Sequence, residues 1–474
     1  MAEKVCERFP LSSAGLTLAL IIAGAAAYAQ PALNMGPATT PLSPTLTGEP
    51  RLSNPTARPA DDTQLKQVII FGRHGVRTPI LPNTALDAFS ALPYPAFLEP
   101  GISVLTHNGG TDETILGGYF RLWLTQEGLL TGNDAADAAF VYLRANGTPL
   151  IVGTAQAFAA GMLPAATVNV NSYSPPAIDP LFDPVDAGVA LLDYRRAVAA
   201  VNGRLGANPQ SLASAWAPEL ALTRSILFNY PVSQTPVPAT PTGRIDVTSI
   251  PIGVAAGSTT LPVDLGGLAD VGGAIDPFVM EYADGLPAAE AGWGQLTVGS
   301  INQTFRLYNV ILDLEYRTPY LARVQSSNVA SHIVRSMVQA ATGNAMKGAL
   351  GSPATKAIVL TGSNTNITGL AGLFHLDWLL PGYEADVCGP GGALVFELRQ
   401  SQSTGEYIVR ASYVSQTLDQ LRNQTALTLA APPPSAPVFI PGCSVDNANF
   451  DCPLGTFVTI ANHVIDPQSA DLVN

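Results

Sequence analysis

Charged side chains are scarce in this chain. They make up 12% of its 474 residues, whereas hydrophobic residues make up 47%. Acidic residues outnumber basic ones by 36 to 23, which gives a formal net charge of −13. A surface of this sign repels nucleic acids and anionic membranes, so we expect neither as a partner. It also repels small anions at long range, so a phosphate site must be a local positive pocket.

Histidine and cysteine are also few, with five and four residues. They are scattered, without the spacing of metal ligands, and we expect no metal and no other cofactor. After the N-terminus no apolar run is long enough to span a bilayer, so we expect a soluble mature chain. No internal repeat of solenoid type is evident. The length allows two or three domains, or one large α/β domain with an insertion.

The N-terminus has the three-part layout of a secretory signal. Lys4 and Arg8 precede an apolar run that ends on small residues at Ala29. We therefore predict a signal peptide over residues 1–29, with an uncleaved membrane anchor as the alternative. Residues 30–62 are rich in Pro, Thr and Ala and predict a linker or mobile tail. The protein is expected to be secreted or periplasmic.

An apolar, strand-like run at 67–71 leads into a cluster of basic residues. Arg73, His74 and Arg77 follow it directly, and Pro79 then excludes regular structure. In an open α/β sheet, ligands bind beyond the carboxyl ends of strands. The planar forks of two arginines suit a phosphate, whose negative charge balances theirs. This pattern predicts an anion site at the end of a strand.

The run Arg73-His74-Gly75-Val76-Arg77-Thr78-Pro79 resembles the Arg-His-Gly-X-Arg-X-Pro signature of the histidine acid phosphatases. This is branch 2 of the histidine phosphatase superfamily, which includes bacterial phytases and glucose-1-phosphatases. The resemblance implies that His74 attacks the phosphoryl group and carries it as phosphohistidine. It also implies that Arg73, Arg77 and Thr78 bind the substrate phosphate. The alternative is a basic loop that pairs with carboxylates of an acidic protein.

The resemblance implies a phosphoglycerate-mutase-like α/β sandwich with an inserted, mostly helical cap. The domain should span residues 63–474, with the cap drawn mainly from about 165–345. The pattern of that range is mostly helical, apart from a Pro-, Thr- and Gly-rich excursion at 232–267. Asp276 and Glu281 fall in this cap and are interpreted as surface carboxylates, with contact to substrate as the alternative.

Apolar runs elsewhere predict further strands at 140–144 and 357–361, helices around 116–124, 154–161 and 367–373, and a hairpin of 394–398 with 407–411.

Two loops that complete the pocket in this family differ here. The family's third arginine falls on Leu150, and Arg144 lies too early in its strand to replace it without a different loop path. The family's Gly-His-Asp-Thr-Asn motif, whose histidine binds phosphate and whose carboxylate donates a proton, reads Gly-Ser363-Asn364-Thr-Asn. Ser363 can still donate one hydrogen bond, but Asn364 has no proton to transfer. The general acid is therefore lost at this position.

We expect an exported acid phosphatase-like protein that hydrolyses phosphomonoesters through His74 with impaired turnover. A missing general acid costs about 10²–10⁴ in rate, and a missing positioned charge or donor costs roughly 10²–10³. The main alternative is a non-catalytic relative that binds a phosphorylated or other anionic ligand. A phosphoglycerate-mutase-like transferase shares the Arg-His-Gly start but fits an exported protein poorly.

Two of the cysteines bracket a short polar loop near the C-terminus. An export signal favours a disulfide between Cys443 and Cys452, and the ends of this loop resemble the C-terminal disulfide loop of bacterial family members. Cys388 is then unpaired. No basic residue lies near it in sequence, so we interpret it as a structural thiol and not as a nucleophile.

Overall fold

The computed structural model describes residues 61–471. The signal peptide predicted at 1–29 and nearly all of the linker predicted at 30–62 lie outside the described residues. The last part of that linker is described, and Asp61 forms a salt bridge of 2.6 Å with Arg410. None of the helices in the described part of the chain combines the length and the apolar character that a membrane crossing requires.

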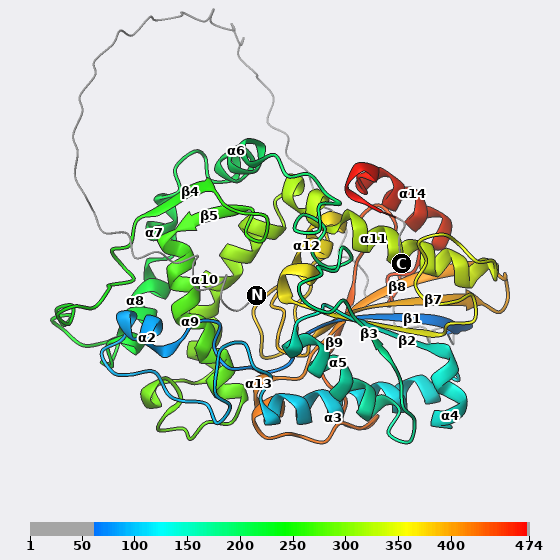
Figure 1. Cartoon of the computed structure of the whole chain (residues 1–474), viewed down its shortest axis with the longest axis horizontal. Coiled ribbons are helices and arrows are strands. Elements are labelled where there is room, and N and C mark those ends of the chain that lie inside the picture. The colour runs from blue at the N-terminus through cyan, green and yellow to red at the C-terminus, as the bar shows by residue number, and fades with distance from the viewer. Residues whose placement is uncertain (1–60, 472–474) are drawn as a thin grey trace, which may run out of the picture.

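A mixed sheet organises the fold, with eight strands in the described part of the chain (Figure 1). Strands β1, β6, β2 and β3 are parallel, while β7 and β8 continue the sheet in antiparallel fashion. In spatial order the strands are β10 (Cys452–Pro453), β8 (Tyr407–Val414), β7 (Ala393–Ser401), β1 (Thr63–Arg73), β6 (Ala357–Gly362), β2 (Val141–Ala145) and β3 (Val170–Asn171), with β9 (Ser435–Val438) paired to β8.

Helices cover both faces of this sheet, and strand β1 is buried between them. Its alternating side chains serve two cores, because successive residues of a strand point to opposite faces. Val68 and Ile70 pack in the core beneath α3 (His107–Gln126) and α5 (Pro149–Met162). Ile69 and Phe71 pack in the opposite core, which is covered by α11 (Pro319–Thr342), α12 (Asn364–Phe374) and α14 (Leu454–Val464).

Two glycines allow α3 and α5 to meet at backbone distance. A Cβ at Gly117 would lie 2.1 Å from the carbonyl oxygen of Phe158, and one at Gly161 would lie 1.9 Å from that of Thr114. Real Cβ atoms do not approach an oxygen so closely, so both positions require glycine. The two helices lie side by side below the sheet in Figure 1.

A mostly helical region lies beside the sheet (Figure 1). It contains α2 (Asn83–Leu86), α6 (Tyr194–Arg204), α7 (Ser211–Ala215), α8 (Ala217–Leu227), α9 (Gly267–Ala283), α10 (Val298–Tyr316) and the hairpin β4 (Ile252–Ala256) with β5 (Val263–Gly266). The hairpin lies within the excursion at 232–267 and was not predicted. Helix α11 falls inside the predicted cap range of about 165–345, yet it packs on α12 and β1. The exact domain boundaries stay a prediction.

The predicted fold class is confirmed: an α/β core carries an added helical region. The strands expected at 140–144 and 357–361 form β2 and β6, and the expected hairpin forms β7 and β8. Helix α5 begins earlier than the predicted 154–161, because Pro149 suits the first helical position, where no hydrogen-bonding N–H is needed. The remaining short helices are α4 (Asp134–Asp137) and α13 (Leu418–Arg422).

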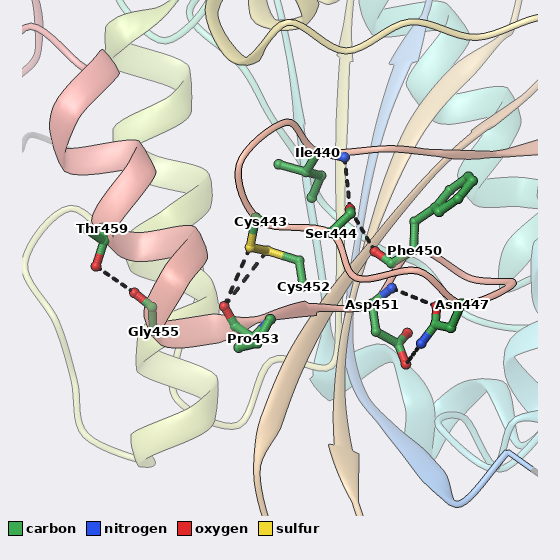
Figure 2. Close-up of a disulfide and its surroundings, with 10 residues drawn as sticks. All are labelled: Ile440, Cys443, Ser444, Asn447, Phe450, Asp451, Cys452, Pro453, Gly455 and Thr459. Carbon is green, nitrogen blue, oxygen red and sulfur yellow. Dashed lines mark hydrogen bonds between the residues drawn. A yellow bond between two sulfur atoms is a disulfide. The ribbon is translucent and has the colours of Figure 1, made fainter. Parts of the chain in front are cut away.

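The predicted disulfide between Cys443 and Cys452 is confirmed and closes a C-terminal loop (Figure 2). Inside the loop, the hydroxyl of Ser444 accepts a hydrogen bond from the Ile440 N–H at 2.9 Å and donates to the Phe450 carbonyl at 2.8 Å. Cys452 opens β10, which pairs with β8 and leads into α14. The disulfide therefore anchors the start of α14 to the edge of the sheet.

Candidate active site

The basic signature lies where the carboxyl ends of parallel strands meet. His74 directly follows β1, and its backbone N–H donates to the carbonyl of Gly362 at the end of β6, at 2.9 Å. Asn146, which follows β2, donates its backbone N–H to the carbonyl of Thr361 at 3.0 Å. Three strands thus deliver their loops to one edge of the sheet, which is where an open α/β sheet binds ligands.

The imidazole of His74 is oriented by its own loop. Nδ1 lies 2.9 Å from the carbonyl oxygen of Gly75, and because a carbonyl only accepts, Nδ1 carries the proton and Nε2 keeps a free lone pair. Burial, together with the positive charges of Arg73 and Arg77, holds the pKa of His74 well below its usual range. The imidazole is therefore neutral in mildly acidic solution, as a nitrogen nucleophile requires.

Helix α5 supports the signature loop through Thr154. The Gly75 N–H donates to Thr154 Oγ1 at 3.3 Å, and the Thr154 hydroxyl donates to the Leu150 carbonyl at 2.9 Å. Leu150 lies one turn before Thr154 and shares its helix face. Leu150, the predicted position of the family's third arginine, thus lies in the turn that faces the loop, and its side chain is buried among apolar neighbours. Arg144 does not replace it, since its guanidinium is held in a salt bridge by Asp179.

Arg73 is buried, with 2% of its surface exposed. Its Nη1 donates to the carbonyl oxygen of Cys388 at 2.5 Å, whereas Nε finds no acceptor among the described residues. A buried N–H without a partner is uncommon in folded proteins, and an anion oxygen would satisfy it. Burial raises the pKa of the Cys388 thiol to about 11, which agrees with the structural role expected for that residue.

Arg77 is held by a carboxylate of α9. It donates to both carboxylate oxygens of Asp276 at 2.9 and 2.8 Å. The expectation that Asp276 and Glu281 are surface carboxylates is wrong, because α9 packs against neighbouring elements and turns both side chains inward. Glu281 accepts a hydrogen bond from the Gly292 N–H at 2.8 Å, and burial raises its pKa to about 8. Asp276 thus enters the site as the counter-charge of Arg77.

The two hydroxyls expected to bind phosphate differ in their availability. Thr78 Oγ1 accepts a hydrogen bond from the Val104 N–H at 2.9 Å, and its own proton has no acceptor among the described residues. Ser363 caps α12 and donates its hydroxyl proton to Asn366 Oδ1 at 3.0 Å. Ser363 could bind phosphate through this proton only after its hydrogen bond to Asn366 breaks. Both roles stay predictions.

Asn364, which the sequence motif predicts at the position of the family's proton donor, is buried. Its amide Nδ2 lies 3.5 Å from the phenol oxygen of Tyr308, which α10 brings to the site. No motif singled out Tyr308, since its only sequence signal was a place in a helical pattern. The exposed residues His375 and Asp377 follow α12 at its far end and do not supply a proton here, as expected.

Helix α3 carries two adjacent buried carboxyl groups, and one of them packs against the signature loop. Neither oxygen of Asp112 has a hydrogen-bond partner among the described residues, and burial raises its pKa to about 8. Glu113 packs against Gly75, where an added Cβ would lie 3.0 Å from its Oε1. Burial, with a contribution from Asp112, raises the pKa of Glu113 well above its usual range. The sequence offered one signal, because Asp112 falls on the same helical stripe as Leu116.

Comparison with known proteins agrees with this geometry. The model of the histidine phosphatase superfamily (branch 2) matches residues 64–226. Phytase AppA of Escherichia coli (strain K12) is 28% identical over 421 residues, which cover 87% of this chain and 94% of that enzyme. Glucose-1-phosphatase of Salmonella typhimurium (strain LT2) is 29% identical over 406 residues, which cover 84% of this chain and 92% of that enzyme.

Solved structures share the whole fold. Hafnia alvei phytase in complex with tartrate matches with a TM-score of 0.77 at 29% identity, covering 87% of this chain and 100% of the phytase. The same phytase in complex with myo-inositol hexakis sulphate gives a TM-score of 0.76. With the signature at the end of β1, these matches lead to one conclusion: over most of its length the chain is similar to the histidine acid phosphatases, branch 2 of the histidine phosphatase superfamily.

Proposed function

We propose that this protein hydrolyses phosphomonoesters slowly, through a phosphohistidine on His74. One observation carries the proposal: a buried imidazole donates Nδ1–H to the Gly75 carbonyl and keeps Nε2 free, between two buried arginines. Nε2 attacks phosphorus, the bond to the alcohol oxygen breaks, and water later releases phosphate from the imidazole. The unpaired Nε of Arg73 receives one phosphate oxygen, and Arg77 divides its donors between Asp276 and the ligand.

Slow turnover follows from three positions. Leu150 brings no charge to the third side of the phosphate, Ser363 uses its proton in a helix cap, and Asn364 has no acidic proton. Loss of a general acid alone costs about 10²–10⁴ in rate. Esters whose leaving group needs no proton, such as an aryl phosphate with an acidic phenol, should suffer least. The same three positions support the second candidate, a non-catalytic protein that binds a phosphorylated or other anionic ligand.

The substrate class is proposed from the relatives and from the closed site. The relatives are phytases and glucose-1-phosphatases, and Hafnia alvei phytase binds myo-inositol hexakis sulphate. Sugar and polyol phosphates are therefore the class to test. Because only 6% of the surface of His74 is exposed, small monoesters should react before highly phosphorylated ones. Neither nucleic acid nor, once the signal is cleaved, a membrane is a proposed partner.

Export is part of the proposal. The predicted signal at 1–29 lies outside the described residues, and the disulfide between Cys443 and Cys452 supports an oxidising compartment, secreted or periplasmic. The test is the N-terminus of the mature protein, which should be Gln30. Recovery of the whole protein in the membrane fraction with Met1 retained would contradict cleavage.

The catalytic proposal is tested by rapid mixing with an aryl phosphate in mildly acidic buffer. We expect a burst of phenol equal to the enzyme present, a phosphoryl label on His74, and slow release of phosphate afterwards. His74→Ala should abolish burst and label, while His463→Ala, an exposed histidine of α14, should leave both unchanged. Absence of burst and label, with phosphate binding still measurable by calorimetry, would favour the non-catalytic alternative.

A further inference from the structure

The reaction needs a proton for the departing alcohol, and the structure offers a donor next to the lost acid. The amide of Asn364 donates towards the phenol oxygen of Tyr308 at 3.5 Å. In that contact the phenol oxygen accepts, so its own proton stays available. Among residues 61–471 that proton has no hydrogen-bond acceptor. Tyr308 therefore holds an unused O–H beside the position where the family keeps its carboxylic acid.

The phenol is held in place by the helices around the site. Helix α10 packs against α9, which carries Asp276, and against α12, which begins with Asn364. The ring of Tyr308 stacks on that of Phe305, with centroids 5.0 Å apart and planes at 24°. This packing restricts rotation of the ring, and a reacting group gains efficiency when its neighbours fix its rotamer.

The charges around Tyr308 belong to the phosphate site. The guanidinium groups of Arg73 and Arg77 favour the phenolate, whereas burial and the carboxylate of Asp276 disfavour it. Burial dominates and raises the pKa of Tyr308 above its usual range. The phenol therefore stays protonated in acidic and neutral solution, which is the state of a proton donor. When it gives up its proton, the positive charges of the two arginines and the Asn364 amide favour the oxygen left behind.

We propose that Tyr308 donates the proton to the leaving-group oxygen, in place of the carboxylic acid that Asn364 has lost. This inference rests on the proposed function. As Nε2 of His74 forms its bond to phosphorus, the bond from phosphorus to the alcohol oxygen breaks. The electron pair stays on that oxygen, which takes the phenol proton and leaves as alcohol. The phenolate then removes a proton from the water that attacks phosphohistidine, the nitrogen–phosphorus bond breaks, and both side chains return to their starting states.

The chemistry suits a slow phosphatase. An alkoxide is a much stronger base than a phenolate, so proton transfer from tyrosine to a departing alkoxide is favourable. Tyrosine is a weaker acid than a carboxylic acid, with an ordinary pKa of about 10. Transfer of the proton is therefore less complete in the transition state, and turnover is slower than with a carboxylic acid. The competing role for Tyr308 is to hold a phosphate oxygen, and the leaving group distinguishes the two roles.

The first experiment compares Tyr308→Phe with the parent protein on two esters. For an alkyl phosphate we expect kcat to fall by about 10²-fold or more, and for an aryl phosphate with an acidic phenol we expect little change. The burst and the label on His74 should persist with the aryl ester. Tyr119→Phe, which removes a tyrosine hydroxyl in α3 away from the site, is the matched control. Equal losses on both esters, or no loss on either, would overturn the proton-donor role.

The second experiment restores the carboxylic acid. In an Asn364→Asp background, alkyl phosphate turnover should rise, and adding Tyr308→Phe should then cost far less than it does in the parent. An equal cost in both backgrounds would show that Tyr308 does not share the role of that acid. If Tyr308→Phe fails to fold, fluorotyrosine at position 308 keeps the ring and lowers its pKa. The alkaline fall of kcat for the alkyl ester should then move to lower pH, and an unmoved profile would refute the proposal.

The two proposals fail in different ways. If the parent forms no phosphohistidine with the aryl ester, the proposed function fails and the role of Tyr308 fails with it. If phosphohistidine forms but Tyr308→Phe does not change the dependence on the leaving group, only the role of Tyr308 is wrong.

Discussion

Arg77 and Asp276 form a bidentate ion pair, with hydrogen bonds of 2.9 and 2.8 Å between residues 199 apart in sequence. Both side chains are buried, with 4% and 0% of their surface exposed. The pair links the signature loop to α9, so the edge of the sheet that carries this loop is joined to the helical region. A bound phosphate must therefore compete with the Asp276 carboxylate for the guanidinium of Arg77, or share that guanidinium with it.

Replacing Asp276 with Asn should leave Arg77 as a buried charge without a counter-ion. Removal of one partner of a buried pair costs about 3–5 kcal/mol of the free energy of unfolding. Inorganic phosphate then supplies the missing negative charge, so it should raise the melting temperature of Asp276→Asn more than that of the parent. Asp313→Asn breaks a half-exposed pair with Arg204 and serves as control, with an expected cost under about 1 kcal/mol. An equal gain from phosphate in parent and Asp276→Asn would contradict this account.

Asp112 should make the protein less stable as the pH rises. Its carboxyl is protonated in the folded state up to a pH of about 8, whereas the unfolded chain loses that proton near 3.8. Between these values the folded state binds more protons, so the free energy of unfolding decreases with increasing pH. Asp112→Asn removes the effect and should match the parent in acid but exceed it in alkaline buffer, by on the order of a few kcal/mol.

Thermal unfolding followed across this pH range checks the prediction. The exposed Asp446 provides the control, since Asp446→Asn should give a curve parallel to that of the parent. Parallel curves for Asp112→Asn as well would mean that the carboxyl at position 112 is ionised in the folded protein.

Restoring the family's side chains should raise turnover. The combined change Leu150→Arg, Ser363→His and Asn364→Asp returns a third positive group, a second histidine and a carboxylic acid to the loops that follow β2 and β6. We expect hydrolysis of an alkyl phosphate to rise by at least about 10²-fold, the range of a single general acid. The control is the same triple change combined with His74→Ala, which should stay inactive. No gain would mean that these loops are misassigned.

Loss of the disulfide should weaken the C-terminal segment. Cys443→Ser with Cys452→Ser frees a loop closed over a sequence separation of 9, and a loop of that size accounts for about 2–3 kcal/mol. Because Cys452 opens β10, hydrogen exchange in α14 should accelerate more than in α3. Cys388→Ala is the comparison for loss of a buried thiol elsewhere. A uniform change in exchange across the molecule would argue against a local anchor.

Sequence reasoning succeeded where local pattern determines structure. The apolar run before Arg73 predicted β1, and His74 lies at the end of that strand, where the anion site was expected. The same reasoning gave β2, β6 and the hairpin of β7 with β8. Strands β1, β2 and β6 can be predicted from the sequence because a buried parallel strand is apolar on both faces and is bounded by turn residues.

The missed residues depend on which elements pack together. The pattern of α9 indicates which face is buried but not that this face meets Arg77, so the sequence alone predicts a surface position for Asp276. Tyr308 was missed for the same reason, because nothing in α10 specifies that α12 lies next to it. Asp112 could have been noticed, since a carboxylate on the apolar stripe of Leu116 must be buried. The absence of hydrogen-bond partners for its carboxyl among the described residues still required the tertiary structure.

The close contact of α3 and α5 at Gly117 and Gly161 reaches beyond their own packing. Glu113 of α3 and Thr154 of α5 both touch Gly75, which also positions the imidazole of His74. The two helices therefore support the imidazole that is proposed as the nucleophile. A larger residue at Gly117 or Gly161 would push α3 and α5 apart. A substitution far from the proposed phosphate site would thereby change the orientation of the His74 imidazole.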